Sequence, residues 1–394
     1  MKAVILAAGE GRRLRPFTET MPKVMLPVAN KPILEHIVDA LKKSGIQEII
    51  FVVGYKKEVI MEHFKDYEDV KIDYVLQDKQ LGTAHALLQA KGKIKNSFLV
   101  ISGDNIIDKN SISKIIQNKS EYCMLINENP HPSKYGAVFL EGNKLKKITK
   151  QSPDETGYYI STGIYKFPPK IFENIKKFTS QGNYSLFSVI QSLVDSGKNI
   201  ATIKADFWMD VVYPWDIINV NEKLIQSTSG STNGTIEKGV VLKGPVSIGK
   251  NTTIYSGSYI VGPVIIGEGC EIGPNTCIFP STVIGDNTVI HPFSEIRNSV
   301  IMNDVHIGSN SSLSHSLIGR GSILHSNFSN IYGEACVEIE NEFKKLKDVG
   351  VMIAEDVTIN NHVVVNPGVI IGRRCIIAPL KKIVESIPSN TKVM

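Results

Sequence analysis

The sequence predicts two domains of different fold class: an α/β domain with a mostly parallel sheet, followed by an all-β solenoid of short strands. Within residues 1–225, short apolar segments alternate with segments whose apolar residues recur at helical spacing. From Ile236 onward an aliphatic residue recurs at every sixth position, a period that neither a helix nor an extended strand has. Residues 226–235 are polar and glycine-rich, which is typical of a linker. A chain of 394 residues also exceeds what one hydrophobic core usually supports.

The first strand of the α/β domain is predicted at the apolar run from Ala3 to Ala8. Further strands are predicted at 49–53, 72–76 and 98–101, and helices at 33–41 and 59–64. Ligands of doubly wound sheets gather at the carboxyl ends of the parallel strands. We therefore expect the chemistry of this domain in the loops that follow its strands.

The loop after the first strand combines glycines with positive charge. Gly9 and Gly11 allow a tight turn against a ligand, and Arg12, Arg13, Arg15 and Lys23 follow within a few residues. Backbone N–H groups and this many cations favour a polyphosphate over a single carboxylate. Glycine spacing alone is equally compatible with a dinucleotide fold or with an ordinary strand-to-helix turn.

A carboxylate follows the strand at 98–101, in the segment Ser102-Gly103-Asp104-Asn105. Mg²⁺ prefers one or two carboxylates together with phosphate oxygens and water, so Asp104 is a candidate metal ligand. Gly-Asp pairs are also common in turns, and the spacing alone leaves that alternative open.

The complete N-terminal string resembles the signature Gly-x-Gly-x-Arg-Leu-x-Pro-x-Thr-x-x-x-Pro-Lys of the sugar-1-phosphate nucleotidylyltransferases. The matching residues are Gly9, Gly11, Arg13, Leu14, Pro16, Thr18, Pro22 and Lys23, with Arg12 where the family usually carries Thr. The resemblance extends over residues 1–225. It implies a Rossmann-like nucleotidyltransferase domain that transfers a nucleotidyl group from a nucleoside triphosphate to a sugar 1-phosphate and releases pyrophosphate.

The resemblance also implies a role for individual residues. Arg13 and Lys23 would be the catalytic cations, and Asp104 and Asp210 would hold Mg²⁺. The nucleotide would be bound by Leu6, Ala8, Gly9, Gly11, Gln77, Gly82 and Thr83, and the sugar phosphate by Gly136, Lys150, Ser161 and Thr162. A polar strand-to-helix loop is the alternative for the segment from Gln77 to Thr83, and a helix cap is the alternative for Asp210. His85 is expected to be a packed helix residue.

Three positions depart from the family pattern. Lys150-Gln151-Ser152-Pro153 stands where Glu-Lys-Pro is frequent, Ser161 replaces an Asn, and Val212 replaces a Gly. Lys150 is the candidate for the second phosphate-binding lysine. The resemblance favours UTP or dTTP as donor. The Leu-Gly-Thr-Ala-His-Ala segment is most similar to that of uridylyltransferases, but thymidylyl and guanylyl transfer use the same framework, so the base stays open. The acceptor is expected to be a hexose or N-acetylhexosamine 1-phosphate.

The second half, residues 236–394, consists of hexapeptide repeats of the kind that build the left-handed parallel β-helix. The hand of that helix follows from the resemblance and not from the spacing. The period slips near Ile301 and becomes strict again at Ile353. The charged segment Glu338–Asp348 cannot continue the inward apolar row, so a projecting loop is expected near 332–350.

Composition narrows the expected partners and location. The net charge of +5 comes without a basic run, which favours anionic metabolites over nucleic acid. No segment approaches the roughly 18 uninterrupted apolar residues of a membrane span, and the N-terminus lacks the features of a signal peptide. We expect a cytoplasmic protein without membrane contact. The resemblance implies a homo-oligomer, with a trimer favoured, assembled through the β-helix.

Two alternatives belong to other functional classes. The chain could be a catalytically inactive regulatory or scaffold subunit, as the departures at Lys150, Ser161 and Val212 suggest. It could also be a bifunctional enzyme whose β-helix acetylates an amino-sugar phosphate. Related acetyltransferases carry a general-base His in Pro-His-Leu-Ser-Tyr, where this chain has Ser312, and a Gly-Ala-Gly turn where it has Ser329 and Ile331. The sequence therefore predicts a structural and oligomerising β-helix.

Overall fold

The computed structural model describes residues 1–128, 137–149 and 159–394. The chain forms two compact units that each draw on more than one segment. The first unit comprises Met1–Glu10, Met21–Met25 and Pro32–Asp210, and the second comprises Gly11–Thr20, Leu26–Lys31 and Val211–Met394. The two units are described separately.

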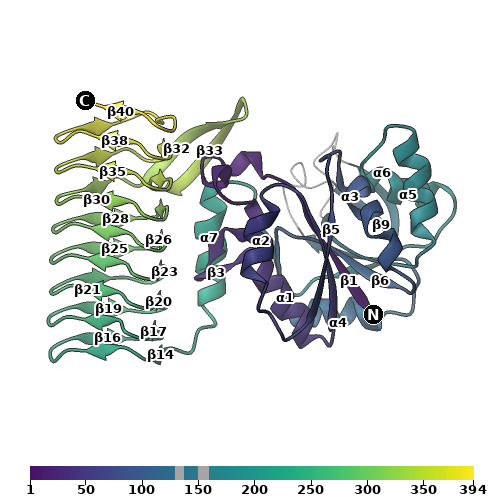
Figure 1. Ribbon diagram of the computed structural model, residues 1–394, viewed down its shortest axis with the longest axis horizontal. Coiled ribbons are helices and arrows are strands. Elements are labelled where there is room, and N and C mark those ends of the chain that lie inside the picture. The colour runs from purple at the N-terminus through teal and green to yellow at the C-terminus, as the bar shows by residue number, and fades with distance from the viewer. Residues whose placement is uncertain (129–136, 150–158) are drawn as a thin grey trace. The chain divides into compact units, whose positions relative to one another are not determined.

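The first unit is built on a nine-stranded sheet whose order is β5-β4-β1-β6-β11-β8-β12-β10-β9 (Figure 1). The four strands β5, β4, β1 and β6 run parallel, and β11 joins β6 antiparallel. Their bounds are β5 Lys71–Leu76, β4 Glu48–Val53, β1 Lys2–Ala7, β6 Phe98–Ser102, β11 Tyr159–Phe167, β8 Cys123–Glu128, β12 Ala201–Lys204, β10 Lys144–Thr149 and β9 Ala137–Glu141. The predicted α/β class with a mostly parallel sheet is confirmed.

The core of this unit lies on both faces of the sheet, because β1 is buried on both sides. Ala3, Ile5 and Ala7 pack in one hydrophobic cluster, and Val4 packs in the other. This alternation explains why the strand has a continuous apolar sequence. The covering helices are α1 Ile33–Lys43, α2 Lys57–His63, α3 Thr83–Gln89, α4 Lys109–Gln117, α5 Ile171–Ser180 and α6 Leu186–Asp195. No helix among the described residues is long and apolar enough to cross a bilayer.

The second unit is a parallel β-helix, seen in Figure 1 as a stack of coils, as the sequence period predicts. Three sheets of eight, nine and eight strands form its faces; they begin at β14 Ser231–Thr232, β15 Thr235–Ile236 and β16 Val241–Lys243 and end at β37 Ile370–Ile371, β40 Lys392–Val393 and β39 Lys382–Ile383. The inward aliphatic residues of most of the short strands form one continuous core. β14 lies in the stretch that the sequence predicts as a linker. This stretch forms a strand because its backbone pairs with β17, Val246–Ile248.

The slip in the period has a simple geometric cause. Ile266 pairs with Ile284, eighteen residues later, so one coil takes three hexapeptides. Ile284 pairs with Ile301 and Ile301 with Ile318, each seventeen residues later. These coils are one residue shorter, and the inward row stays in register although the sequence period breaks.

One face of the β-helix is covered by a helix of its own unit. α7, Pro214–Ile225, contacts β26 Val300–Ile301 and β29 Leu317–Ile318, and the outward side chains of Val300 and Leu317 are buried. An apolar outward row would otherwise be exposed to water, so burial of this face favours attachment of the helix.

The charged insertion folds as an antiparallel hairpin of β32, Gly333–Ile339, and β33, Glu342–Val349. Its base packs over Gly368, where a side-chain Cβ would lie 2.6 Å from Cβ of Ala335. The hairpin projects from the β-helix in Figure 1. A projecting segment near 332–350 was expected, and the two strands give it a defined shape.

Candidate active site

The candidate active site of the first unit begins at the carboxyl ends of β1 and β6. Gly103 N–H donates to the Leu6 carbonyl at 3.0 Å, which joins the loop after β6 to the end of β1. A Cβ at Gly103 would lie only 2.9 Å from that carbonyl oxygen, so the close approach requires glycine. Asp104 follows directly and is delivered to this edge of the sheet.

A second carboxylate reaches the same place from a distant part of the chain. β13, Trp208–Asp210, pairs antiparallel with β7, Asn105–Ile107, and Asp210 lies opposite Asn105. This short pairing places Asp210 next to the residue that follows Asp104. The alternative of a cap does not apply to α7, whose capping carboxylate is Asp216, accepting from the backbone N–H groups of Val212 and Tyr213.

Lys23 joins the two carboxylates. Its Nζ lies 2.6 Å from Oδ2 of Asp104 and 3.5 Å from Oδ1 of Asp210. The side chains of Lys23 and Asp210 are each only 13% exposed, so the interactions are weakly screened by water. Burial by itself would lower the pKa of Lys23, but the charges of Asp104 and Asp210 outweigh burial and raise that pKa. The site therefore carries a permanent cation between two acids.

The pair of carboxylates fits the requirements of a magnesium ion. Among the described residues no cluster of three or more His, Cys, Asp or Glu side chains forms a closed metal site. Two carboxylates that leave positions for phosphate oxygens and water are the donor set that Mg²⁺ prefers beside a nucleotide. The attraction of Asp104 and Asp210 for a cation is already visible in their contacts with Lys23.

A cavity of about 190 Å³ lies beside this cluster. Six predicted site residues line it together: Leu6, Thr83, Asp104, Ser161, Thr162 and Asp210. They come from separate strands and loops, so the fold brings the expected nucleotide, metal and sugar-phosphate positions into one space. Residues that the sequence did not indicate also line it, among them Ser102, Asn105, Tyr165, Phe187 and Trp208.

A bulge in β11 shapes one wall of the cavity. The pairing of β11 with β8 shifts register between Ser161 and Tyr165, and Gly163 between them has φ +74°. The Ser161 hydroxyl lies 2.8 Å from the Tyr165 hydroxyl, and Thr162 Oγ1 donates to the Leu125 carbonyl at 2.8 Å. Burial raises the pKa of Tyr165 to about 12, so its hydroxyl stays protonated and can donate.

Asn105 is the functional candidate that sequence reasoning missed most clearly. It is 2% exposed, and its Nδ2 donates to the Thr162 carbonyl at 2.7 Å, which ties the metal side of the cavity to the bulge. Its position directly after Asp104 was a usable signal. A polar side chain that is buried beside a candidate acid is expected to be hydrogen-bonded.

The expected base-recognition residues also lie together. Gln77 is 4% exposed, and its Nε2 donates to the Gly82 carbonyl at 3.2 Å. The same amide lies 3.0 Å from Nδ1 of His85, and Thr83 Oγ1 accepts from the N–H of Leu186 at 3.0 Å. His85 is a packed helix residue as expected, but it also fixes the orientation of the Gln77 amide.

The remaining predicted residues have different outcomes. The Ala8 carbonyl accepts from the N–H of Tyr55 at 3.1 Å, and a Cβ at Gly9 would meet no protein atom within 4 Å. Gly11 and Arg13 belong to the second unit, where Gly11 has φ +79° and Arg13 Nε lies 3.5 Å from Oε2 of Glu340 in the hairpin. Gly136 and Lys150 lie outside the described residues.

Comparison with known proteins gives matches over both halves of the chain. The profile of the Nucleotidyl transferase family matches residues 2–227, and that of the GMPPB C-terminal domain matches residues 260–393. The chain is 39% identical over 404 residues to the bifunctional protein GlmU of Methanococcus maripaludis, an alignment that covers 100% of this chain and 97% of that protein. It is 35% identical over 242 residues to the UTP–glucose-1-phosphate uridylyltransferase AglF of Haloferax volcanii, with 59% of this chain and 100% of that protein covered.

A solved structure shows the same fold. The putative glucose-1-phosphate thymidylyltransferase of Bacillus anthracis superposes with a TM-score of 0.54 at 24% identity, covering 59% of this chain and 98% of its own. The profile spans more than half of the sequence, and the relative from Methanococcus maripaludis aligns over 97% of its length. The clustered lysine and carboxylates at the sheet edge agree with these matches, and the chain therefore belongs to the nucleotidyl transferase family.

Proposed function

We propose that this protein is a sugar-1-phosphate nucleotidylyltransferase, which transfers a nucleotidyl group from UTP or dTTP to a hexose or N-acetylhexosamine 1-phosphate. The observation that carries the proposal is the contact of Lys23 with both Asp104 and Asp210 beside a cavity that Ser161 and Thr162 also line. The uridylyl and thymidylyl activities in the names of the relatives support the choice of donor.

The reaction requires charge compensation more than a chemical nucleophile from the protein. An oxygen of the sugar 1-phosphate forms a new bond to the α-phosphorus while the bond to the β-phosphate oxygen breaks and pyrophosphate leaves. Both substrates are strongly anionic, and the buried cation of Lys23 compensates part of their charge. Mg²⁺ held by Asp104 and Asp210 would supply Lewis-acid stabilisation of the phosphates. Asn105 and the bulge at Gly163 hold the cavity wall in place.

A substrate panel tests this proposal directly. The purified chain is incubated with UTP, dTTP, GTP, ATP or CTP and with glucose, glucosamine, N-acetylglucosamine or mannose 1-phosphate, and pyrophosphate release is followed. We expect release that needs both substrates and a divalent cation and is fastest with UTP or dTTP. Absence of release with every pair would contradict the proposal and would favour the inactive regulatory subunit.

We further predict that the β-helix performs no acetyl transfer. Ser312, at the position of the general base, is an exposed serine on β28, Ser312–Ser314. His315 has φ +51° and stacks on Tyr332 with ring centroids 4.5 Å apart. Burial lowers the pKa of His315, which favours the neutral ring, but the stacking on Tyr332 covers one face of that ring. Incubation with acetyl-CoA and glucosamine or galactosamine 1-phosphate should release no free thiol above background; steady release abolished by His315→Ala would overturn this prediction.

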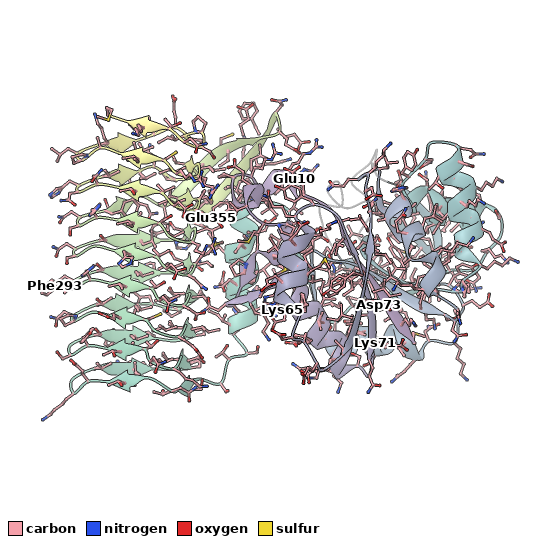
Figure 2. All side chains as sticks on the ribbon, in the orientation of Figure 1. Glu10, Lys65, Lys71, Asp73, Phe293 and Glu355 are labelled. Atoms are coloured by element: carbon pink, nitrogen blue, oxygen red, sulfur yellow. The ribbon has the colours of Figure 1, made fainter. Side chains whose placement is uncertain are left out.

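A homo-oligomer, with a trimer favoured, is the expected assembly. Large apolar side chains are exposed on the β-helix: Phe293 is 64% exposed at a turn, labelled in Figure 2, and Leu380 is 79% exposed at another. Ile323 and Ile376 face outward from one of its sheets. Burying such residues against a second copy is favourable. Sedimentation equilibrium at micromolar concentration should give a multiple of 43.4 kDa, and a species of that mass alone would refute the assembly.

A further inference from the structure

The β-helix contains a buried carboxylate that the proposed reaction does not use. Among the described residues, Lys166 and Glu355 are the charged side chains that are almost fully buried, and Glu355 is 3% exposed. Glu355 stands at the turn after β34, Met352–Ile353, two residues beyond the inward Ile353. Glu268 has the equivalent place two residues after Ile266 in an earlier coil, and it is exposed. A feature specific to its own coil therefore buries Glu355.

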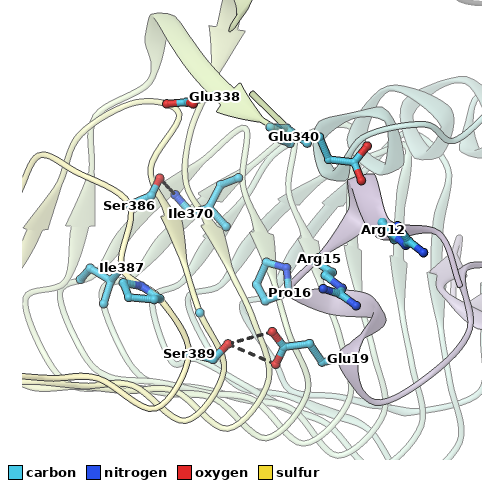
Figure 3. Close-up of a pocket in the computed structure, with 13 residues that line it drawn as sticks. Arg12, Arg15, Pro16, Glu19, Glu338, Glu340, Ile370, Ser386, Ile387 and Ser389 are labelled. Carbon is cyan, nitrogen blue, oxygen red and sulfur yellow. Dashed lines mark hydrogen bonds between the residues drawn. The ribbon is translucent and has the colours of Figure 1, made fainter. Parts of the chain in front are cut away.

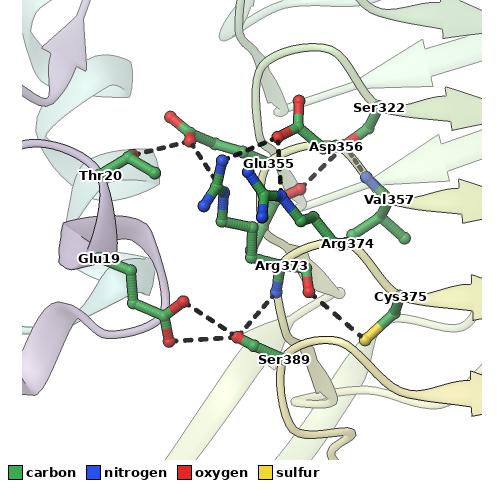
Figure 4. A network of polar contacts seen from close by, with 11 residues as sticks. Glu19, Thr20, Ser322, Glu355, Asp356, Val357, Arg373, Arg374, Cys375 and Ser389 are labelled. Carbon is green, nitrogen blue, oxygen red and sulfur yellow. Dashed lines mark hydrogen bonds and ion pairs between the residues drawn. The ribbon is translucent and has the colours of Figure 1, made fainter.

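That feature is the signature loop Gly11–Thr20, which belongs to the same compact unit. Thr20 Oγ1 donates to Oε2 of Glu355 at 2.7 Å. Two coils further on, Ser389 Oγ lies 3.1 Å from both carboxylate oxygens of Glu19 and donates to that group. Figure 4 shows both contacts, with Thr20 and Glu19 on one segment facing the turns of the β-helix.

These contacts come from one column of the β-helix. Ile353 pairs with Ile371, and Ile371 with Ile387, so Glu355, Arg373 and Ser389 occupy the same turn position in three successive coils. The N–H of Arg373 donates to Ser389 Oγ at 3.0 Å, which orients the serine towards the loop. The column is thus a row of polar residues whose spacing is set by the stacked coils.

Arg373 supplies the counter-charge that a buried carboxylate requires. Its Nε lies 3.7 Å from Oε2 of Glu355, and its guanidinium also contacts Asp356 at 3.1 Å. Oε1 of Glu355 makes no hydrogen bond with any described residue. Among the described residues, Thr20 is therefore the side chain that donates a hydrogen bond to the carboxylate of Glu355.

A cavity borders one part of this loop. A cavity of about 560 Å³ is lined by Arg12, Arg15 and Pro16 of the loop and by Ile370 and Ile387 of the β-helix. Figure 3 shows these lining residues. The loop is anchored by the buried side chains of Leu14 and Phe17, and the polar contacts of Glu19 and Thr20 fix its end on the turns of the β-helix. Thr18 Oγ1 donates to the Gly11 carbonyl at 3.1 Å, so the end of the loop is hydrogen-bonded to its start.

We propose that Glu355 is a positioning residue for nucleotidyl transfer, through which the β-helix holds the nucleotide-binding loop by Thr20. The inference rests on the proposed function, because the loop carries Gly11 and Arg13 of the nucleotide signature and Lys23 follows Thr20 by three residues. By holding this loop, Glu355 contributes to the affinity for the triphosphate. Glu355 does not touch the reacting atoms and acts only through Thr20.

The test compares variants in the full-length protein, assayed by pyrophosphate release. Glu355→Ala and Thr20→Val should each raise KM for the nucleoside triphosphate about tenfold, as expected for loss of a hydrogen bond to a charged group, with kcat changed less than about threefold. Thr20→Ser keeps the hydroxyl donor, and Glu355→Gln keeps an oxygen acceptor. Each of these two variants should therefore have nearly the wild-type KM. Glu268→Ala, at the exposed equivalent position, is the matched control and should leave KM unchanged.

The double variant separates positioning from general damage to the fold. If Glu355 acts through Thr20, KM of the double variant should equal that of either single variant, because the second substitution removes nothing further. Multiplicative effects, or unchanged KM with a lowered melting temperature in both single variants, would overturn the inference. Failure of the proposed function itself is distinguishable, since the wild-type protein would then release no pyrophosphate at all.

Discussion

Replacing Asp104 with alanine is expected to lower kcat for pyrophosphate release about 10²-fold or more at saturating substrate and Mg²⁺. Asp104 contacts Lys23 at 2.6 Å and stands with Asp210 at the cation-binding edge of the sheet. A metal carboxylate matters most when negative charge accumulates on the leaving pyrophosphate, so the loss should appear mainly in kcat. Steady-state kinetics over a Mg²⁺ titration measure both parameters.

The control for this prediction is Asp73→Ala. Asp73 is on β5 of the same sheet, and its contact is an ion pair with Lys93 at 3.5 Å. It should retain activity within about twofold, since a partly exposed ion pair contributes little. Circular dichroism should show that Asp104→Ala keeps its fold, because Lys23 still has Asp210 as a partner. Turnover near the wild-type rate in Asp104→Ala would remove this residue from the mechanism.

Lys23→Met should lower kcat/KM about 10²- to 10³-fold, because it removes the buried cation nearest to the carboxylate pair. The methionine keeps much of the side-chain volume, so the loss reports charge and not packing. Asp104 and Asp210 are then left without this counter-ion, and the variant should gain more thermal stability from MgCl₂ than the wild type does. Pyrophosphate release and melting temperatures with and without Mg²⁺ provide the two measurements.

The raised pKa of Lys23 also predicts how its contribution to stability depends on pH. The folded-state pKa of Lys23 lies above its ordinary value of 10.5, so its contribution is complete below that pH and is lost only as the pH rises through the folded value. Between pH 6 and about 9, the difference in melting temperature between wild type and Lys23→Met should therefore be constant. Equal stability of the two proteins, with equal response to MgCl₂, would mean that Lys23 does not balance these carboxylates.

The alternation of strands and helices, and the sheet edge at which the candidate site forms, were predictable from sequence. Apolar runs such as Ala3–Ala8 are long enough to be buried on both faces, and parallel strands bring the residues that follow them to one edge. Asp104 was therefore placed by the strand before it. The six-residue period predicted the β-helix core in the same local way, since each inward residue depends on its own short strand.

The tertiary structure was needed wherever a partner lies far away in the sequence. Asp210 reaches Asp104 through the pairing of β13 with β7, and Asn105 reaches Thr162 across fifty-seven positions. No local pattern encodes such distances, because they depend on how whole elements pack. The sequence also could not show that coils are shortened by one residue without loss of register.

By itself the sequence determined the two fold classes and indicated the candidate phosphate-binding loop and the candidate acids, because these depend on local composition and period. Glu355 shows what only the tertiary structure decided. In the repeat it is a polar turn residue like Glu268, and its chemistry changes because Thr20, 335 positions away, covers it. Burial depends on packing between segments that are distant in the sequence. A buried carboxylate needs a hydrogen-bond donor and a counter-charge, which Thr20 and Arg373 provide for Glu355.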